Sequence, residues 1–404
     1  MRKATIVLSA SLAVCSLSAV TGGLLLPAVA IAQQKVGAVV GKHLKTAQEA
    51  IQKKRWDAAL AAIKQAQAVD TKTAFEQYKI NELLWYVYLQ QGRNADAARL
   101  LEQQIASGQM PAGEQVQRTK TLAQLYFRAG SYGKASQAAT QYLKSAPGDQ
   151  DMQLLVANAY YQQKDYKNAI AAAERMLKSG GRPSEDLLQL LLRSNYEIKD
   201  QAGTARALEQ LLKYYPSPDT WDRLLDDYIA RTKNDHELMA LYRLSEDVGA
   251  LRKARQYTDM SQALVVDGFA IEGQRIVEQG LAANVFQGEE LGRAQRTLES
   301  AKRSADKERA ALAKAPATLA AAKTGDEMVA VGKLYFSAGQ YAQSADALRK
   351  GIARGGVADL DAANMLLGIA LVRQGKHAEA AKAFDAIKNP TFAEIGRLWK
   401  LRAR

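Results

Sequence analysis

Apolar residues recur along the chain at intervals of three and four, the spacing of one face of an α-helix. The segment 132–143 is a clear case, with apolar residues at Ala135, Ala138, Ala139, Tyr142 and Leu143. Many such positions are alanine and few are valine, which favours closely packed helices over sheets. Prolines punctuate the pattern at a constant interval of 36, at Pro111, Pro147 and Pro183. Because a helix interior does not tolerate proline, they mark helix ends, and the pattern predicts an all-α chain.

The helical pattern itself repeats. Three passages each carry an aromatic residue, a turn residue, a second aromatic and a small residue: Tyr126, Gly130, Tyr132 and Ala135; Tyr160, Lys164, Tyr166 and Ala169; Tyr335, Gly339, Tyr341 and Ser344. The first two passages are offset by 34 residues. A single helical pair of this length cannot bury its own apolar face, so the repetition predicts units that stack on their neighbours.

This repeat resembles the tetratricopeptide repeat (TPR), a helix–turn–helix unit of about 34 residues. The unit 116–149 matches the small, aromatic, glycine and proline positions of that family at Ala123, Tyr126, Gly130, Tyr132, Ala135 and Pro147. Other units carry the aromatic residues Trp56, Tyr88, Tyr196 and Trp221. The resemblance implies a right-handed α-solenoid of stacked TPR-like units, about eight in number.

The repeat pattern is uneven along the chain and suggests three helical regions. Residues 33–245 read as an N-terminal TPR-like array, and 325–404 as a C-terminal pair with a capping helix. Between them, 246–324 holds degenerate helical repeats or a joint. There, 245–256 is polar without a clear small-residue site, and 288–323 is basic and then rich in alanine.

The first 32 residues predict a signal peptide. Arg2 and Lys3 precede an apolar run that ends in Ala30-Ile31-Ala32, the small-residue pattern of a signal-peptidase site, with cleavage before Gln33. We therefore expect an exported, periplasmic protein without a stable transmembrane span. An uncleaved membrane anchor is the alternative. The only cysteine, Cys15, lies in this segment, so the mature chain has no thiol for catalysis or disulfides.

Charge and motif content favour a non-catalytic protein. The net charge is +13, with basic and acidic residues interspersed as on a solvated helical surface. The three histidines are far apart, and none has a metal-ligand spacing. The sequence contains no nucleophile elbow, phosphate-binding glycine loop or dinucleotide fingerprint. We expect no enzyme activity, no cofactor and no metal, and export argues against nucleic acid as a partner.

The TPR resemblance also implies a binding groove, lined by the first helix of each unit. The positions that face it in the family correspond to Lys120, Gln124, Phe127, Arg128, Asn158, Tyr161, Lys333 and Phe336. Aromatic rings beside basic and amide groups suit an extended peptide. The alternative is that Phe127, Tyr161 and Phe336 pack against neighbouring helices. The basic segment 293–309 is a second possible contact surface.

One TPR subtype is disfavoured. Repeats that grip a C-terminal carboxylate use a lysine followed one turn later by asparagine, with basic residues from the third unit. Here Gln124 follows Lys120, and we expect Leu187 and Leu191 at the third-unit positions. The prediction is a scaffold or adaptor that binds a protein or peptide segment in an envelope-associated complex. The alternative is binding of an anionic glycan or lipid in polysaccharide export or cell-wall assembly.

Overall fold

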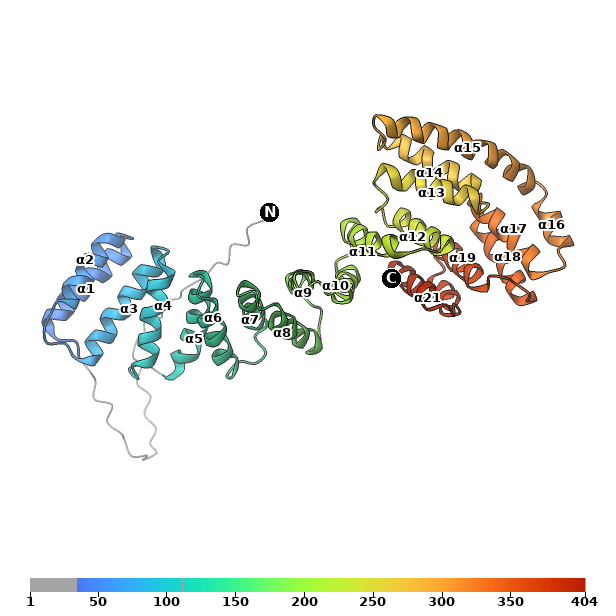
Figure 1. The fold of residues 1–404 in the computed structure, drawn as a ribbon. Coiled ribbons are helices and arrows are strands. Elements are labelled where there is room, and N and C mark those ends of the chain that lie inside the picture. The colour runs from blue at the N-terminus through green and yellow to red at the C-terminus, as the bar shows by residue number, and fades with distance from the viewer. Residues whose placement is uncertain (1–34, 111, 404) are drawn as a thin grey trace, which may run out of the picture. The chain divides into compact units, whose positions relative to one another are not determined.

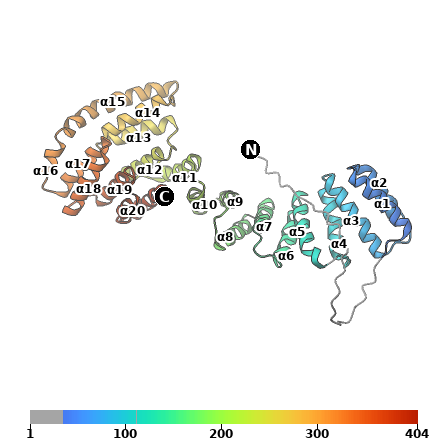
Figure 2. The ribbon, with the colours of Figure 1, turned by 180° about the vertical axis from the view of Figure 1, so that it is seen from behind.

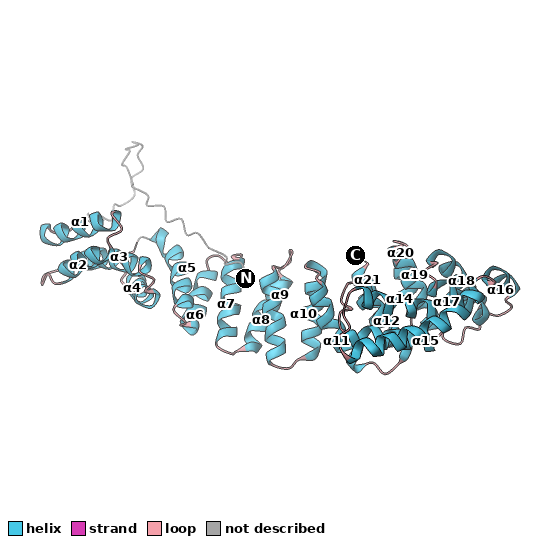
Figure 3. Ribbon diagram, turned by 90° about the horizontal axis from the view of Figure 1, so that it is seen from above, coloured by secondary structure: helices cyan, strands magenta, loops and turns pink. Residues whose placement is uncertain are grey.

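The computed structural model describes residues 35–110 and 112–403, and every regular element in those ranges is a helix (Figure 3). The predicted signal peptide 1–32 lies outside these residues. The first ten helices are α1 (Ala38–Gln52), α2 (Trp56–Gln67), α3 (Ala74–Gln90), α4 (Asn94–Ala106), α5 (Ala112–Arg128), α6 (Tyr132–Leu143), α7 (Gln150–Gln162), α8 (Tyr166–Lys178), α9 (Glu185–Glu197) and α10 (Gln201–Tyr214).

The remaining helices run to the C-terminal end of the described chain. They are α11 (Pro218–Arg231), α12 (Asp235–Asp247), α13 (Ala254–Val266), α14 (Ala270–Ala282), α15 (Glu289–Leu312), α16 (Ala315–Ala321), α17 (Gly325–Ser337), α18 (Tyr341–Arg354), α19 (Leu360–Val372), α20 (His377–Asp385) and α21 (Pro390–Arg402). The basic segment 293–309 falls within α15, the longest helix of the described chain. The all-α prediction is confirmed.

The same turn joins the helices of successive pairs and fixes their register. Gly130, Lys164 and Lys199 each have a positive φ just before the second helix begins. The next residue donates its backbone N–H to a carbonyl five residues earlier, as in Ser131 to Tyr126, Asp165 to Tyr160 and Asp200 to Asn195. This is the Schellman arrangement, which satisfies carbonyls that the first helix leaves unpaired at its end. Residues at equal distances before these turns are therefore structurally equivalent.

Alanines lie where the helices of a pair meet. Ala135 and Ala169, in equivalent second helices, are fully buried. Ala123 packs in one apolar cluster with Ala139 and Met152. Because alanine carries only a methyl group, it lets two helix axes approach closely. From α5 to α10 each helix packs on the next one along the chain (Figure 1).

The chain divides into two compact units. The smaller contains the described residues up to Arg93 together with Ala106–Gln109, and the larger contains Asn94–Ile105 and the chain from Met110 onward. In the smaller unit α1 packs on α2 and α3, and Glu76 in α3 accepts a 2.8 Å hydrogen bond from the backbone N–H of Gly37. The predicted boundaries after residues 245 and 324 both fall inside the larger unit, and they stay predictions about repeat regularity.

The C-terminal half of the larger unit closes on itself. The last helix, α21, packs against α19, its near neighbour in the chain, and also against α12, which lies far earlier (Figures 1 and 2). The hydroxyl of Tyr228 in α11 donates a 2.9 Å hydrogen bond to Glu394 in α21, and Arg402 pairs with Asp247 at the end of α12. Helix α17 contacts α14, α15 and α19. One buried apolar cluster runs through these helices, from Ala173 to Trp399.

Candidate functional site

Six of the eight predicted groove residues lie on two helices that contact each other, α5 and α7. Lys120 on α5 is already engaged: its Nζ lies 2.7 Å from Asp149, which also accepts a hydrogen bond from Tyr142. The hydrogen bond to Asp149 raises the pKa of Lys120. Burial alone raises the pKa of Asp149, but the bonds from Lys120 and Tyr142 outweigh it and lower that pKa. The charge of Lys120 is thus largely offset.

The aromatic residues Phe127 and Tyr161 are half-buried at equivalent positions. The ring of Phe127 meets Tyr132 edge-on, with centroids 5.3 Å apart, and Tyr161 meets Tyr166 in the same way at 5.4 Å. Each ring therefore packs against the tyrosine that begins the following helix, and part of its surface is open to solvent. The packing alternative therefore holds in part for these two side chains, and their assignment to a binding groove stays a prediction.

The other predicted groove residues on α5 and α7 are polar and at least partly accessible. Gln124 is half-buried and Arg128 is exposed. Asn158 is half-buried and donates a 3.0 Å hydrogen bond to the carbonyl of Leu154, one turn earlier in α7. That bond fixes the side-chain amide, whose oxygen stays available to a donor.

The third unit presents different residues from those expected. The turn at Lys199 makes Tyr196 equivalent to Phe127 and Tyr161, and makes Gln189 and Arg193 equivalent to Lys120 and Gln124. Tyr196 is 69% exposed, and the guanidinium of Arg193 lies 5.3 Å from the centre of the Tyr161 ring.

The expected positions of Leu187 and Leu191 are wrong, because both side chains are buried in the apolar core. One basic residue, Arg193, therefore stands in the third unit where we expected an apolar one. Two features of α5 still disfavour a carboxylate-binding groove: Gln124 stands where asparagine is expected, and Lys120 is paired with Asp149.

Phe336 is not on an open surface. It is 1% exposed and meets Phe269 and Tyr341 edge-on, at centroid distances of 6.1 and 5.3 Å. The guanidinium of Arg243 lies 4.8 Å from its ring. The groove assignment is wrong for this residue, because the closure of the C-terminal half surrounds it with other helices. The packing alternative holds for Phe336.

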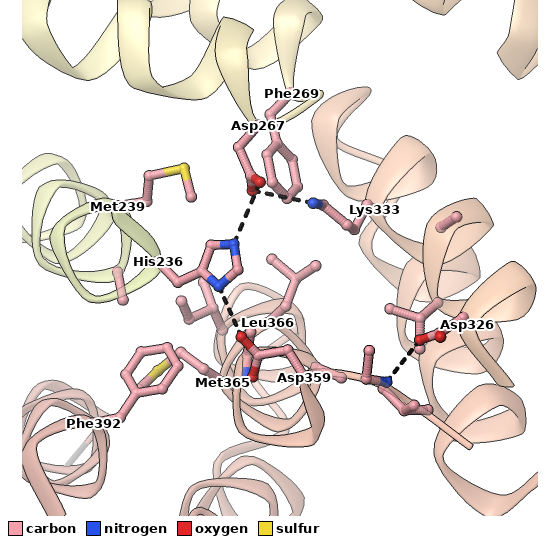
Figure 4. A pocket seen from close by; sticks show the side chains of 18 of the residues that line it. His236, Met239, Asp267, Phe269, Asp326, Lys333, Asp359, Met365, Leu366 and Phe392 are labelled. Atoms are coloured by element: carbon pink, nitrogen blue, oxygen red, sulfur yellow. Dashed lines mark hydrogen bonds and ion pairs between the residues drawn. The ribbon is translucent and has the colours of Figure 1, made fainter. Parts of the chain in front are cut away.

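Lys333, one turn earlier on α17, does line a cavity, of about 250 Å³ (Figure 4). Its walls come from α12, α17, α19, α21 and the loops before α14 and α19. Much of the lining is apolar and includes Met239, Val329, Met365, Leu366, Ile369 and Phe392. Of the eight predicted groove residues, only Lys333 lines this pocket.

A chain of ion pairs forms the polar side of the pocket. His236 lies between two carboxylates: Nδ1 is 2.9 Å from Asp359 and Nε2 is 3.4 Å from Asp267. Asp267 also binds the Nζ of Lys333 at 3.1 Å. The hydrogen bond with Asp267 raises the pKa of His236, and Asp359 adds to this against the effect of burial. Burial would raise the pKa of Asp267, but His236 and Lys333 together lower it.

A second ion pair, Arg243–Glu272, stands behind the pocket. Glu272 accepts from Arg243 Nη2 at 2.7 Å and from Nε at 3.1 Å, and both side chains are almost fully buried. The rings of Phe269 and Phe336 lie 4.3 and 4.8 Å from the guanidinium. Such a pair needs these partners, because an isolated charge is costly to bury. The pair joins α12 to α14 and holds one wall in place.

The basic segment 293–309 forms an exposed face of α15. Arg293 pairs with Asp259 at 3.1 Å and Arg309 with Asp306 at 2.9 Å. Arg296, Arg303 and Lys307 are also exposed. Acidic residues on the same helix, such as Glu299 and Asp306, reduce the net positive charge of this face. This face of α15 therefore has neither aromatic residues nor a concentrated positive charge to favour one kind of partner.

Across residues 35–110 and 112–403, no group of three or more histidine, cysteine or acidic side chains is arranged to hold a metal ion. Within the same residues, no helix combines the length and apolar character needed to cross a bilayer.

Comparisons with solved structures return repeat proteins and complexes with low similarity. A tetratricopeptide repeat protein from Parabacteroides merdae is 12% identical, with a TM-score of 0.33, over 83% of this chain and 100% of that one. A chain of the Naa15/Naa10 complex bound to HypK-THB is 16% identical, with a TM-score of 0.43 over 90% of this chain. The pentatricopeptide repeat protein PPR10 from maize is 14% identical, with a TM-score of 0.34 over 91%. The present chain covers 61% of each of the last two.

Sequence comparison adds a family match. None of the curated proteins compared with this chain matches it. A family model for the tetratricopeptide repeat matches two segments, residues 120–184 and 330–393. The first contains the groove residues of α5 and α7, and the second contains Lys333 and Phe336. The chain therefore carries tetratricopeptide repeats in these two segments.

Proposed function

We propose that this protein is a non-catalytic scaffold that binds an extended segment of a partner protein along α5, α7 and α9. The single observation that carries the proposal is an aligned row of aromatic residues. Phe127, Tyr161 and Tyr196 occupy equivalent positions in three consecutive units, each three residues before a residue of positive φ.

A second row runs beside the aromatic one. Gln124, Asn158 and Arg193 lie one turn earlier on the same three helices, and all are at least partly accessible. Rings can cover apolar side chains of a bound peptide, while amides and a guanidinium hydrogen-bond its backbone carbonyls. The rows lie on rigid helices whose neighbours pack against them, so a peptide meets a surface that is already formed.

We also propose that the protein acts in the bacterial-type envelope after export. The support is the basic start, the apolar run and the Ala30-Ile31-Ala32 site of the sequence. A periplasmic location would limit the partner to exported proteins or to the exported parts of membrane proteins.

Tyr196 gives the cleanest test because its ring is the most exposed of the three. Replacing it with photoreactive p-benzoyl-phenylalanine should crosslink a specific partner in intact cells. The same replacement of the exposed Val266, on α13, serves as the control. With the partner identified, the double variant Phe127→Ala/Tyr161→Ala should weaken binding by at least about 2 kcal/mol in calorimetry.

Circular dichroism checks that the double variant keeps its helices. A variant that folds and binds like the parent would exclude the row as the binding surface. A variant that unfolds would show that Phe127 and Tyr161 act mainly in packing, and Tyr196→Ala would then decide the question alone.

A further inference from the structure

The pocket between α12, α17 and α19 is separate from the row on α5–α9 and has its own chemistry. We infer that it binds the arginine side chain of a partner protein. This inference rests on the proposed function in one respect: it takes the occupant to come from a protein.

The size of the pocket indicates a single side chain as occupant. Its volume of about 250 Å³ is below the range of roughly 300–1,000 Å³ found for pockets that enclose drug-sized ligands. Met239, Met365 and Leu366 offer an apolar wall against which the methylene stem of a long side chain can pack. Arginine is also among the residues that most often anchor protein interfaces in such pockets.

The charge balance of the pocket favours a cation. Six charged or titratable side chains line it: His236, Arg243, Asp267, Asp326, Lys333 and Asp359. Arg243 is neutralised by Glu272 behind the wall, and Lys333 is matched by Asp267. Two carboxylates remain, Asp326 and Asp359, with His236 as the only group that can change the balance near neutral pH.

These carboxylates have capacity left for a donor. Asp326 is exposed, and within the described chain only its Oδ1 accepts a hydrogen bond, from the backbone N–H of Ala358 at 2.9 Å. Asp359 caps α19 through Oδ1 and meets His236 through Oδ2, with its side chain 51% exposed. A guanidinium presents several N–H donors in a planar fork, which suits carboxylate acceptors better than the single ammonium of lysine.

The charge state of His236 should make binding in this pocket depend on pH. With neutral His236 the pocket carries two uncompensated negative charges, and with protonated His236 it carries one. A cationic occupant therefore binds more tightly when His236 is neutral, and its binding favours loss of that proton. An anionic occupant would show the opposite pH dependence.

The test uses the full mature chain and a blocked arginine, N-acetyl-arginine methylamide, as probe. The side-chain NMR signal of His236, assigned with His236→Gln, reports occupancy. We expect saturable shifts, tighter binding near pH 8 than near pH 5.5, and at least fivefold weaker binding of the neutral isostere N-acetyl-citrulline methylamide. Asp326→Asn and Asp359→Asn should each weaken arginine binding, and both can keep their backbone contacts because an asparagine oxygen also accepts.

Asp346→Asn is the matched control, since Asp346 pairs with Lys350 on the exposed face of α18 and does not line the pocket. Equal binding of arginine and citrulline, tighter binding at the lower pH, or no shift at all would overturn the inference. Failure here leaves the crosslinking test at Tyr196 intact, because that test does not involve the pocket. Loss of the Tyr196 crosslink with retained arginine binding would instead remove the aromatic row.

Discussion

The indole Nε1 of Trp399, in the last helix, donates a 3.2 Å hydrogen bond to the backbone carbonyl of Ala240 in α12, 159 residues earlier. The ring of Trp399 is fully buried and stacks on Phe384 at a centroid distance of 6.5 Å. This contact joins α21 to a helix nine positions earlier in the chain, through a side chain that is among the largest fully buried ones.

Trp399→Ala should therefore lower the free energy of unfolding by about 3–5 kcal/mol, because it removes a large buried ring and leaves a cavity. Trp399→Phe keeps most of the packing and loses mainly the hydrogen bond, so its cost should be smaller. Urea denaturation followed by circular dichroism measures both. A small effect of Trp399→Ala would mean that α21 does not hold this half closed.

Glu272→Gln should destabilise the protein strongly, by about 3–5 kcal/mol, because it leaves the buried guanidinium of Arg243 without a charged partner. The matched control is Glu379→Gln, which breaks an exposed pair with Arg349 and should change stability by less than about 1 kcal/mol. Equal effects in the two variants would contradict the importance assigned to burial.

Ala135→Leu and Ala169→Leu should each cost about 1–3 kcal/mol, because both alanines are fully buried between helices and a larger side chain overpacks the site. Ala310→Leu, on the exposed face of α15, serves as a control and should leave the melting midpoint almost unchanged. Thermal melts compare the three variants. Unchanged midpoints for Ala135→Leu and Ala169→Leu would show that the two sites can expand freely.

The ion pairs of His236 should make stability depend on pH. The pKa of His236 is raised on folding, so its contribution is complete below the ordinary value of 6.5 and is lost as the pH rises through the folded-state pKa. The pKa of Asp267 is lowered, so its contribution is complete above the ordinary value of 3.8 and is lost as the pH falls through its folded-state pKa. Both are fully present between pH 3.8 and 6.5.

The destabilisation caused by His236→Gln should accordingly be greater near pH 5.5 than near pH 8.5. Denaturant titrations at the two pH values measure the difference, and His377→Gln, at an exposed position, is the control. If His236→Gln costs the same at both pH values, the two carboxylates do not stabilise the charged imidazole.

The exported protein should begin at Gln33. Intact-mass spectrometry of material purified from the periplasm tests this, because cleavage after Ala32 fixes the mass of the product. A full-length chain in the membrane fraction would favour the anchor instead.

The sequence predicted the local features of the fold well, because they depend on near neighbours. Buried alanines, proline-marked helix ends and the turns after Tyr126 and Tyr160 all have a short-range signal. The expected third-unit residues Leu187 and Leu191 lie two residues before Gln189 and Arg193, which occupy those positions. One residue of this offset arises because the turns at Lys164 and Lys199 are 35 residues apart, whereas those at Gly130 and Lys164 are 34 apart. The sequence held the correction: Tyr161 and Tyr196 each precede a Lys-Asp pair by the same interval.

The pocket and the closure could not be predicted in this way. His236, Asp267 and Asp359 come from three separate places in the chain, and no periodic pattern links them. Phe336 matched a groove position in sequence, yet the packing of Phe269 and Arg243 around it depends on helices that meet only after the chain has closed. Such long-range contacts leave no mark on the spacing within one repeat.

The packing of α21 on α12 also has a kinetic consequence. An open repeat array can unfold one unit at a time from either end, because each unit contacts only its neighbours. Here the last helix is tied to α12, so fraying from the C-terminus first requires breaking the contact with Ala240. Native-state hydrogen exchange should then show that α12 and α21 open together, as one cooperative unit. Helices α1 and α2 should open independently of them, with a lower opening free energy.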